Sequence, residues 1–207
     1  DVLGSRGLGD VYKRQLQLRP KPIVSGGLIP FWVKTEEDAA SIRTKTYNAR
    51  AESIFDKPSF RSSVTSKRCL IPSTGWFDWR HEKGKKIPYF IYVKDEEIFS
   101  MAGIYSEWQH PQTRQTLYTF SIITTAANEL MRCIHNTNFR MPVLLYKEEE
   151  EKWLYPELNR PAIEEFLQPF DSDRMEAYVI DNHFLQKSPY DPTVIKPFPP
   201  PPNYTLG

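Results

Sequence analysis

The chain has 207 residues, a formal net charge of +1 and two cysteines, so it can bury a hydrophobic core without metal or disulfide support. No stretch approaches the roughly 18 uninterrupted apolar residues of a membrane-spanning helix, and no charged start followed by an apolar run marks a secretory signal. We therefore expect one globular domain in a reducing compartment, with no membrane partner.

The two ends of the chain differ in composition from the middle. Residues 1–15 (DVLGSRGLGDVYKRQ) show no sustained helical or strand period, and we expect them to be a non-native leader. A single domain is expected over residues 16–195. Residues 196–207 are rich in proline, which has no backbone N–H to donate, so they are expected to form an extended tail. A strap, a frayed end and a proline-ligand motif are the alternatives for this tail.

Secondary structure is predicted in chain order from periodicity and capping. Pro30 interrupts the apolar run of residues 27–32, which indicates a turn or an edge. Thr35 can cap a short helix over about residues 36–42. β-Branched and aromatic residues with short polar connections predict antiparallel neighbours farther on. The predicted strands cover residues 87–94, 97–108, 116–125 and 141–146, and the predicted helices cover residues 126–134 behind a Thr125 cap, about 148–154, and 161–167.

The segment TYNARAES (residues 46–53) carries the first candidate site. If it is extended, Asn48 and Arg50 share one face, an arrangement that can hold a polar reactant and an anion side by side. Seven basic residues, among them Arg61, and two acidic residues lie between Arg43 and Arg68, which gives this stretch a formal charge of +5. The cluster suits a phosphate-bearing partner, and a solvated surface is the alternative.

Aromatic residues and one carboxylate form a second group of candidates. Trp32, beside the proline-broken turn, can stack on unpaired bases, whereas Trp76 and Trp79 in GWFDW (residues 75–79) are better explained as core residues. Asp78 lies inside this aromatic run, where desolvation favours a protonated carboxyl that suits acid–base work near neutral pH. Pattern alone gives more weight to the alternative, in which Asp78 is an exposed strand residue.

His135 follows the predicted helix of residues 126–134, and it is the third candidate. A helix C-terminus favours a charged imidazole, which suits proton exchange near neutral pH, and a structural role is the alternative. The four histidines and two cysteines show no metal-ligand spacing, so neither a metal nor a cofactor is expected. A thiol hydrolase based on Cys133 or Cys69 is disfavoured, because Cys133 and His135 at i and i+2 on a helix do not face each other.

Seven motifs occur in an order that resembles the SOS response-associated peptidase family, which is defined by the SRAP domain. They span about residues 23–145 and are GLIPFW, NARAES, KPSFR, RCLIPSTGWFDW, PYFIY, TTAANELMRCIHN and RMPVLL. The resemblance implies an α+β fold of mainly antiparallel, barrel-like sheets with flanking helices, and an open groove from Trp32 past Asn48 to His135. It also implies a monomer that recognises abasic sites in single-stranded DNA, in a bacterial cytoplasm near the nucleoid or in a eukaryotic nucleus.

The resemblance further assigns roles to individual residues. The catalytic positions of the family match Asn48, Asp78 and His135, with Asp78 standing where the family usually has Glu. On the DNA-binding side the matching residues are Arg50, Pro30 and Trp32, to which we add the basic Arg61. Asp is one methylene shorter than Glu, so its backbone must lie closer to the reacting atoms.

In the family a terminal cysteine, exposed when the initiator methionine is removed by self-processing or otherwise, supplies both reacting groups. Its α-amine, with an ordinary pKa of about 7.7–8.0, attacks the aldehyde of the opened abasic sugar, and its thiol then closes a thiazolidine ring. The chain begins with Asp1, and the nitrogens of Cys69 and Cys133 are amides. A chain that begins with Asp1 is therefore expected not to crosslink, and the alternative function is a non-catalytic single-stranded-DNA-binding module.

Overall fold

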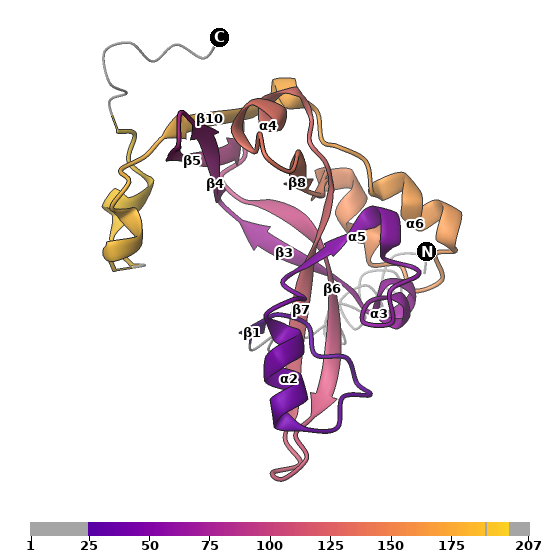
Figure 1. Cartoon of the computed structure of the whole chain (residues 1–207). Helices are drawn as coiled ribbons and strands as arrows, with labels where there is room; N and C mark the ends of the chain where they lie inside the picture. The colour runs from indigo at the N-terminus through magenta and orange to yellow at the C-terminus, as the bar shows by residue number, and fades with distance from the viewer. Residues whose placement is uncertain (1–24, 189, 199–207) are drawn as a thin grey trace, which may run out of the picture.

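The computed structural model describes residues 25–188 and 190–198 (Figure 1). The expected leader of residues 1–15 and residues 199–207 of the expected tail lie outside the described residues. In the described part, two β-sheets meet near one end of a long hairpin, and short helices lie around them.

The larger sheet is built on a hairpin of two long antiparallel strands, β6 (Phe99–Gln109) and β7 (Thr116–Ala126). Both strands alternate buried residues with more exposed ones along part of their length, as a strand with one face on the core does. Five shorter strands complete this sheet, and they are β1 (Ser25–Gly26), β2 (Asn48–Arg50), β3 (Arg68–Ser73), β8 (Arg140–Pro142) and β9 (Leu144–Leu145). β2 runs parallel to β7 and β8 antiparallel to it, so β7 fixes the register of both.

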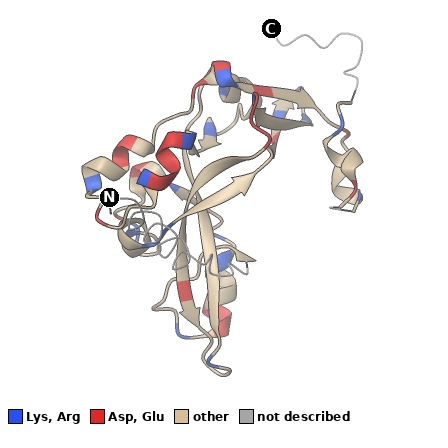
Figure 2. Cartoon of the chain, turned by 180° about the vertical axis from the view of Figure 1, so that it is seen from behind, with Lys and Arg blue, Asp and Glu red and all other residues tan. Residues whose placement is uncertain are grey.

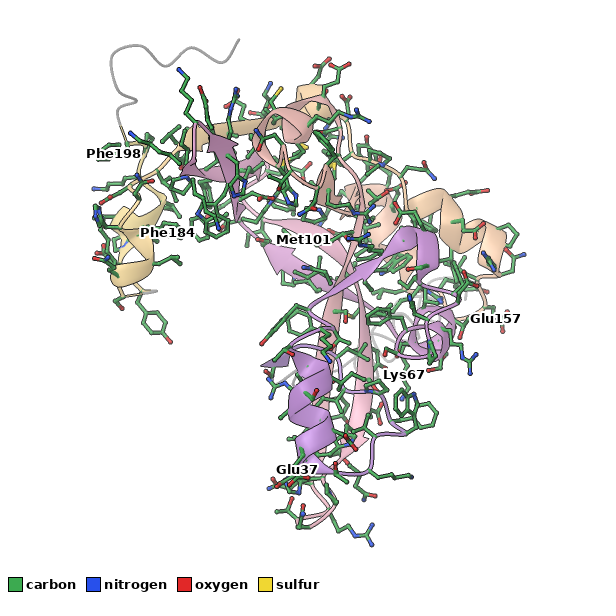
Figure 3. The ribbon with its side chains drawn as sticks, viewed as in Figure 1. Glu37, Lys67, Met101, Glu157, Phe184 and Phe198 are labelled. Atoms are coloured by element: carbon green, nitrogen blue, oxygen red, sulfur yellow. The ribbon has the colours of Figure 1, made fainter. Side chains whose placement is uncertain are left out.

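The smaller sheet has three antiparallel strands in the order β10 (Met175–Val179), β5 (Lys85–Val93) and β4 (Trp76–Glu82). The C-terminal segment packs against it, since the rings of Phe77 and Phe184 lie 4.7 Å apart (Figure 3). The prediction of a mainly antiparallel α+β fold is thus confirmed, but the described strands form two separate sheets and no closed barrel. β4 is the outer strand of its sheet, and side chains bond its free edge.

The helices follow the predicted ones with two clear exceptions, a later start at residue 129 and a helix over residues 61–66 that was not predicted. Thr35 caps α2 (Glu36–Arg43) by accepting a hydrogen bond from the Asp38 N–H, as the sequence predicts. The helix predicted from residue 126 instead begins three residues later, because Asn128 is the N-cap of α4 (Glu129–Ile134) and Ala126 still pairs in β7. The remaining helices are α3 (Arg61–Ser66), α5 (Glu150–Trp153) and α6 (Arg160–Phe166), with single turns of 3₁₀ helix at residues 51–53, 147–149, 172–174, 184–186 and 192–195.

The strand predicted over residues 141–146 is divided into two. β8 pairs with β7 and β9 pairs with β6, and Val143 between them bonds both long strands. The Val143 N–H donates to the Ile123 carbonyl, while the Val143 carbonyl accepts from the Ala102 N–H, each at 2.9 Å. A single extended segment therefore crosses from one strand of the hairpin to the other, which a one-dimensional pattern does not reveal.

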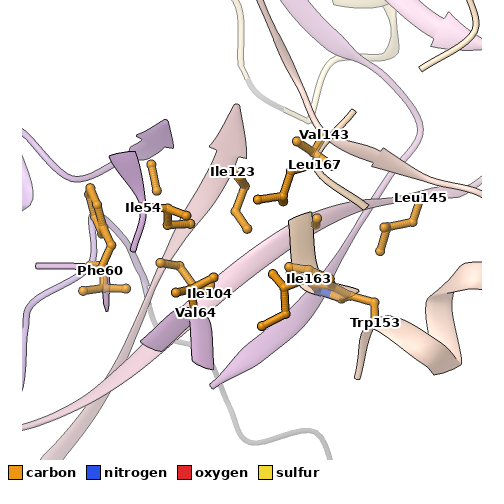
Figure 4. Close-up of a cluster of buried hydrophobic side chains, with 13 residues drawn as sticks. Ile54, Phe60, Val64, Ile104, Ile123, Val143, Leu145, Trp153, Ile163 and Leu167 are labelled. Atoms are coloured by element: carbon orange, nitrogen blue, oxygen red, sulfur yellow. The ribbon is translucent and has the colours of Figure 1, made fainter. Parts of the chain in front are cut away.

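The main core lies between the β6–β7 hairpin and the helices α3, α5 and α6 (Figure 4). Trp153 of α5 is fully buried there, and its indole N–H donates to the Cys69 carbonyl at 3.0 Å. Charged residues of both signs occur on α5 and α6 (Figure 2). No described helix has the length and apolar character needed to cross a membrane.

Candidate functional site

A cavity of about 410 Å³ opens where the two sheets meet. Its residues come from β2, β4, β6, β7, β8 and the turn after α4, and Met101 of β6 is labelled in Figure 3. The lining residues are Asn48, Arg50, Trp76, Phe77, Asp78, Met101, Ile122, Thr124, His135, Asn138, Arg140, Met141 and Pro142. All three predicted catalytic residues and Arg50 therefore line one cavity, although they lie up to 87 positions apart in the sequence.

β2 places Asn48 and Arg50 on the cavity. The two residues lie opposite Ile122 and Thr124 of β7, and Ala49 between them is fully buried in the core. Because side chains alternate across a strand, burial of Ala49 directs both polar neighbours to the other face. The predicted shared face is confirmed, and β7 fixes it through main-chain pairing.

β4 places Asp78 in the same cavity from the opposite side. Its side chain is only 19% exposed, and its Oδ1 accepts the Trp79 N–H at 2.8 Å. Burial raises the pKa of Asp78, while the Trp79 hydrogen bond and the charges of His135 and His81 lower that pKa by less. The structure therefore favours a partly desolvated cavity residue over the exposed strand residue that pattern alone preferred.

His135 lies at the C-cap of α4 and faces Asp78. Its Nδ1 is 3.6 Å from the Asp78 Oδ2 and 3.0 Å from the Arg140 carbonyl oxygen. A carbonyl oxygen can only accept, so Nδ1 carries the hydrogen when this bond is made. The Nε2 atom is then left as the ring position that can take up or release a proton.

Arg140 is a cavity residue that the sequence analysis did not single out. Its guanidinium makes a two-pronged ion pair with Glu52, with Nη2 at 3.0 Å from Oε2, and Nη2 also bonds the Thr124 Oγ1 at 3.2 Å. The Arg140 hydrogen bond is the main reason that the pKa of Glu52 is lowered. The RMP motif contained the signal, but an arginine at the start of a strand does not by itself indicate a site.

The structure does not bring the other predicted DNA-binding residues into this cavity. Trp32 is 42% exposed and lines a different cavity with residues of α2, so the expected groove from Trp32 past Asn48 to His135 stays a prediction. Pro30 is buried at a turn, and its carbonyl accepts a hydrogen bond from the Val33 N–H. Arg61 is exposed at the start of α3. Local motifs located these residues in the chain, but whether they line this cavity depends on how distant segments pack together.

Neither cysteine lines the cavity. Cys69 is buried and its pKa is raised to about 12 by that burial, which suits a core thiol and not a nucleophile. Cys133 is exposed on α4, two residues before the cavity-facing His135. In the described part of the chain, no three His, Cys, Asp or Glu residues are grouped so that they could hold a metal ion.

Comparison with known proteins decides the family. The family model described as "SOS response associated peptidase (SRAP)" matches residues 12–186. The chain belongs to the SRAP family. The resemblance inferred from the seven motifs is therefore confirmed.

The relatives of this SRAP chain are named abasic site processing proteins. The chain is 45% identical over 158 residues to the abasic site processing protein YoqW of Bacillus subtilis (strain 168), and the match covers 75% of this chain and 67% of YoqW. It is 36% identical over 148 residues to the abasic site processing protein HMCES of Gallus gallus, of which it covers 43%. A protein from Bacteroides thetaiotaomicron with a known crystal structure has 59% sequence identity to this chain. The two structures match with a TM-score of 0.82, over 83% of this chain and 74% of the other chain.

Proposed function

We propose that this SRAP chain recognises abasic sites in single-stranded DNA and that the cavity at the junction of its two sheets holds the opened sugar. One observation carries the proposal: Asn48, Arg50, Asp78 and His135 line a single cavity in a member of this family. Relatives named abasic site processing proteins, at 45% and 36% identity, support the substrate class.

Arg50 is the group that would bind a phosphate next to the lesion. Its side chain makes no hydrogen bond or ion pair within the described part of the chain, whereas the guanidinium of Arg140 is occupied by Glu52 and Thr124. A guanidinium fork matches two oxygens of a phosphate, and such charge-assisted bonds are the strong ones. The free fork of Arg50 and the amide of Asn48 share one face, so a phosphate and a sugar oxygen can be bound together.

Asp78 and His135 supply proton transfer in this proposal. Opening the sugar ring removes a proton from the anomeric hydroxyl and delivers one to the ring oxygen. The raised pKa of Asp78 lets it keep its proton to a higher pH than an ordinary carboxyl does. The Nε2 of His135 can accept a proton while Nδ1 remains bonded to the Arg140 carbonyl.

The covalent step needs a cysteine with a free α-amine, and the described residues that line the cavity include no cysteine. A free amine attacks the aldehyde and expels water to give an imine, and a thiol on the same residue then adds to the imine carbon to give a thiazolidine. A terminal cysteine offers both groups, and the peptidase activity in the family's name fits a self-processing step that exposes it. We propose that a chain with this fold carries out the capture reaction when its first residue is cysteine.

The proposal is tested with a single-stranded oligonucleotide carrying one abasic site and with the same strand intact. The chain that begins with Asp1 is expected to shift the abasic strand on a native gel and to give no band that survives heat and detergent. A version whose first residue is cysteine, in a family-type start, is expected to give a stable adduct with the abasic strand only. Equal binding of both strands, with no adduct from the cysteine version, would show a plain DNA-binding module instead.

A further inference from the structure

The outer edge of β4 has backbone groups that no strand of the described residues pairs with. Trp79 lies opposite Pro88 of β5, which has no N–H, and the Pro88 carbonyl instead accepts from the Ile180 N–H on its other side. Trp79 therefore directs its backbone groups away from β5, and His81, two residues on, does the same. These are the groups that side chains bond: Asp78 accepts the Trp79 N–H, and an asparagine bonds His81.

We propose that Asn136 is a positioning residue that locks the turn carrying His135 onto the free edge of β4. Its Oδ1 accepts the His81 N–H at 3.0 Å, and its Nδ2 donates to the His81 carbonyl at 2.8 Å. Two bonds to one residue replace a strand neighbour and fix both distance and register. Asn136 is the last residue of the motif TTAANELMRCIHN, but the sequence analysis gave it no role, and it is not among the residues that line the cavity.

The position of Asn136 explains why this lock acts on the catalytic pair. Asn136 directly follows His135, and His81 lies three residues after Asp78 on the same strand. The turn itself belongs to the larger sheet, because the Ala127 N–H donates to the Phe139 carbonyl next to β8. The Asn136 bonds therefore join the two sides of the cavity and hold the His135 Nδ1 at 3.6 Å from the Asp78 Oδ2.

Packing alone does not fix that distance. The buried face of α4, with Met131 and Ile134, anchors the helix in the core that also contains Tyr89 of β5. Beyond Ile134 the chain leaves the helix, and His135 and Asn136 are only half-buried. A misplacement of a reacting group by about 1 Å can lower the rate on the order of 100-fold. Specific hydrogen bonds at this point therefore matter more than further apolar contact.

The test measures the coupling of Asp78 and His135 without DNA. The ¹³C signal of the Asp78 carboxyl is titrated in the parent chain, in His135→Gln, in Asn136→Ala and in the double variant, all of which keep His81. His135→Gln removes a cation that lowers the pKa of Asp78, so this pKa is expected to rise in the parent background. In the Asn136→Ala background the same substitution is expected to produce less than about half of that rise. An equal rise in both backgrounds would overturn the proposal.

Controls separate positioning from general loss of structure. Asn159→Ala removes the N-cap of α6, far from β4, and is expected to lower the melting temperature while leaving the His135→Gln effect intact. Asn136→Gln keeps the amide and serves if the alanine variant does not fold. In the Asn136→Gln background, His135→Gln is expected to raise the pKa of Asp78 more than it does in the Asn136→Ala background. A rise equal to that of the parent in both Asn136 backgrounds would again overturn the proposal.

The role in reactivity rests on the proposed function, and its readout is separate. In the version with a cysteine start, Asn136→Ala is expected to slow adduct formation roughly 10- to 100-fold without weakening strand binding, because β2 holds Arg50 independently. If no version of the chain forms an adduct, the capture proposal fails while the NMR result still decides whether Asn136 couples the pair. An unchanged adduct rate in a folded, adduct-forming Asn136→Ala variant would refute its role in the reaction.

Discussion

The two sides of the cavity are held in place by different kinds of interaction. β2, with Asn48 and Arg50, is paired residue by residue with β7 in the middle of the larger sheet. β4, with Asp78, is an edge strand whose outer side meets His135 and its turn only through side chains. The binding side is therefore a property of the backbone fold, whereas the acid–base side depends on a few side-chain bonds.

This difference predicts how each side responds to substitution. A change on the β2 side removes one contact and leaves the strand where it is, because Ala49 and the pairing to β7 remain. A change on the β4 side removes a contact and also loosens the geometry of its neighbours. Strand binding and adduct formation should therefore be separable by mutation, which two substitutions test, and two more test stability around the cavity.

The largest effect is expected for His135→Gln in the version with a cysteine start. Removing a positioned acid–base group typically costs about 10²- to 10⁴-fold in rate, and Gln keeps a polar side chain of similar size. Adduct formation is measured under single-turnover conditions on denaturing gels, and strand affinity is measured in parallel. A rate within a factor of about two of the parent would show that His135 transfers no proton, and a parallel loss of affinity would show that the two sides are not independent.

Arg50→Gln is expected to act on binding instead. Loss of one charge-assisted contact to a phosphate corresponds to about 1.5–3 kcal/mol, or roughly 10- to 150-fold in the dissociation constant. The slope of log affinity against log salt should fall by about 0.7 for a single strand. Arg114→Gln, at the exposed tip of the β6–β7 hairpin, is the matched control and should change neither quantity. An unchanged salt slope for Arg50→Gln would remove it from the phosphate contact.

Local chemistry made part of the fold and site predictable from the sequence. The Thr35 cap of α2 and the shared face of Asn48 and Arg50 depend on neighbours within a few residues, and both are confirmed. Thr125 has the same capping chemistry, but its strand continues because Met141 pairs with it from across the sheet. Such long-range pairing overrides a local preference, and a single sequence does not reveal it.

The environment of the site residues was less predictable than their identity. Asp78 resembled an exposed strand residue because its alternation with Phe77 and Trp79 is local, whereas the residue that partly buries it, His135, is 57 positions away. Trp32 lies beside a turn as expected, yet its cavity is formed with α2 and not with β4. Arg140 was missed because its role depends on Glu52, 88 positions earlier.

Glu52→Gln is expected to have a smaller effect than the two substitutions above, and the effect should be a lower free energy of unfolding. The pKa of Glu52 is lowered in the folded chain, mainly by the Arg140 hydrogen bond, so its stabilising effect is present above the ordinary carboxyl pKa and is lost as the pH falls through the folded pKa. Because Glu52 is more than half exposed, solvent screening limits this effect to about 0.2–1 kcal/mol. Urea unfolding at neutral and acid pH measures it. A difference from the parent that persists in acid would show that charge is not its origin.

The smallest effect is expected for the stability of Asp78→Asn. It is the one substitution of the four that should make the folded chain more stable. Because burial raises the pKa of Asp78 in the folded chain, the stability associated with this group is fully present below its ordinary value of 3.8 and is lost as the pH rises through the folded pKa. Burial penalises the ionised form of Asp78 in the folded chain, whereas Asn is neutral at every pH and its oxygen can still accept the Trp79 N–H. The variant should melt above the parent at neutral pH and approach it on acidification. It should also form adducts more slowly, because an amide cannot exchange a proton with the sugar as a carboxyl group can. Greater stability combined with lower activity is the pattern expected of a residue retained for chemistry on the less firmly held side of the cavity, and a variant that is less stable at neutral pH would show that Asp78 mainly holds β4 in place.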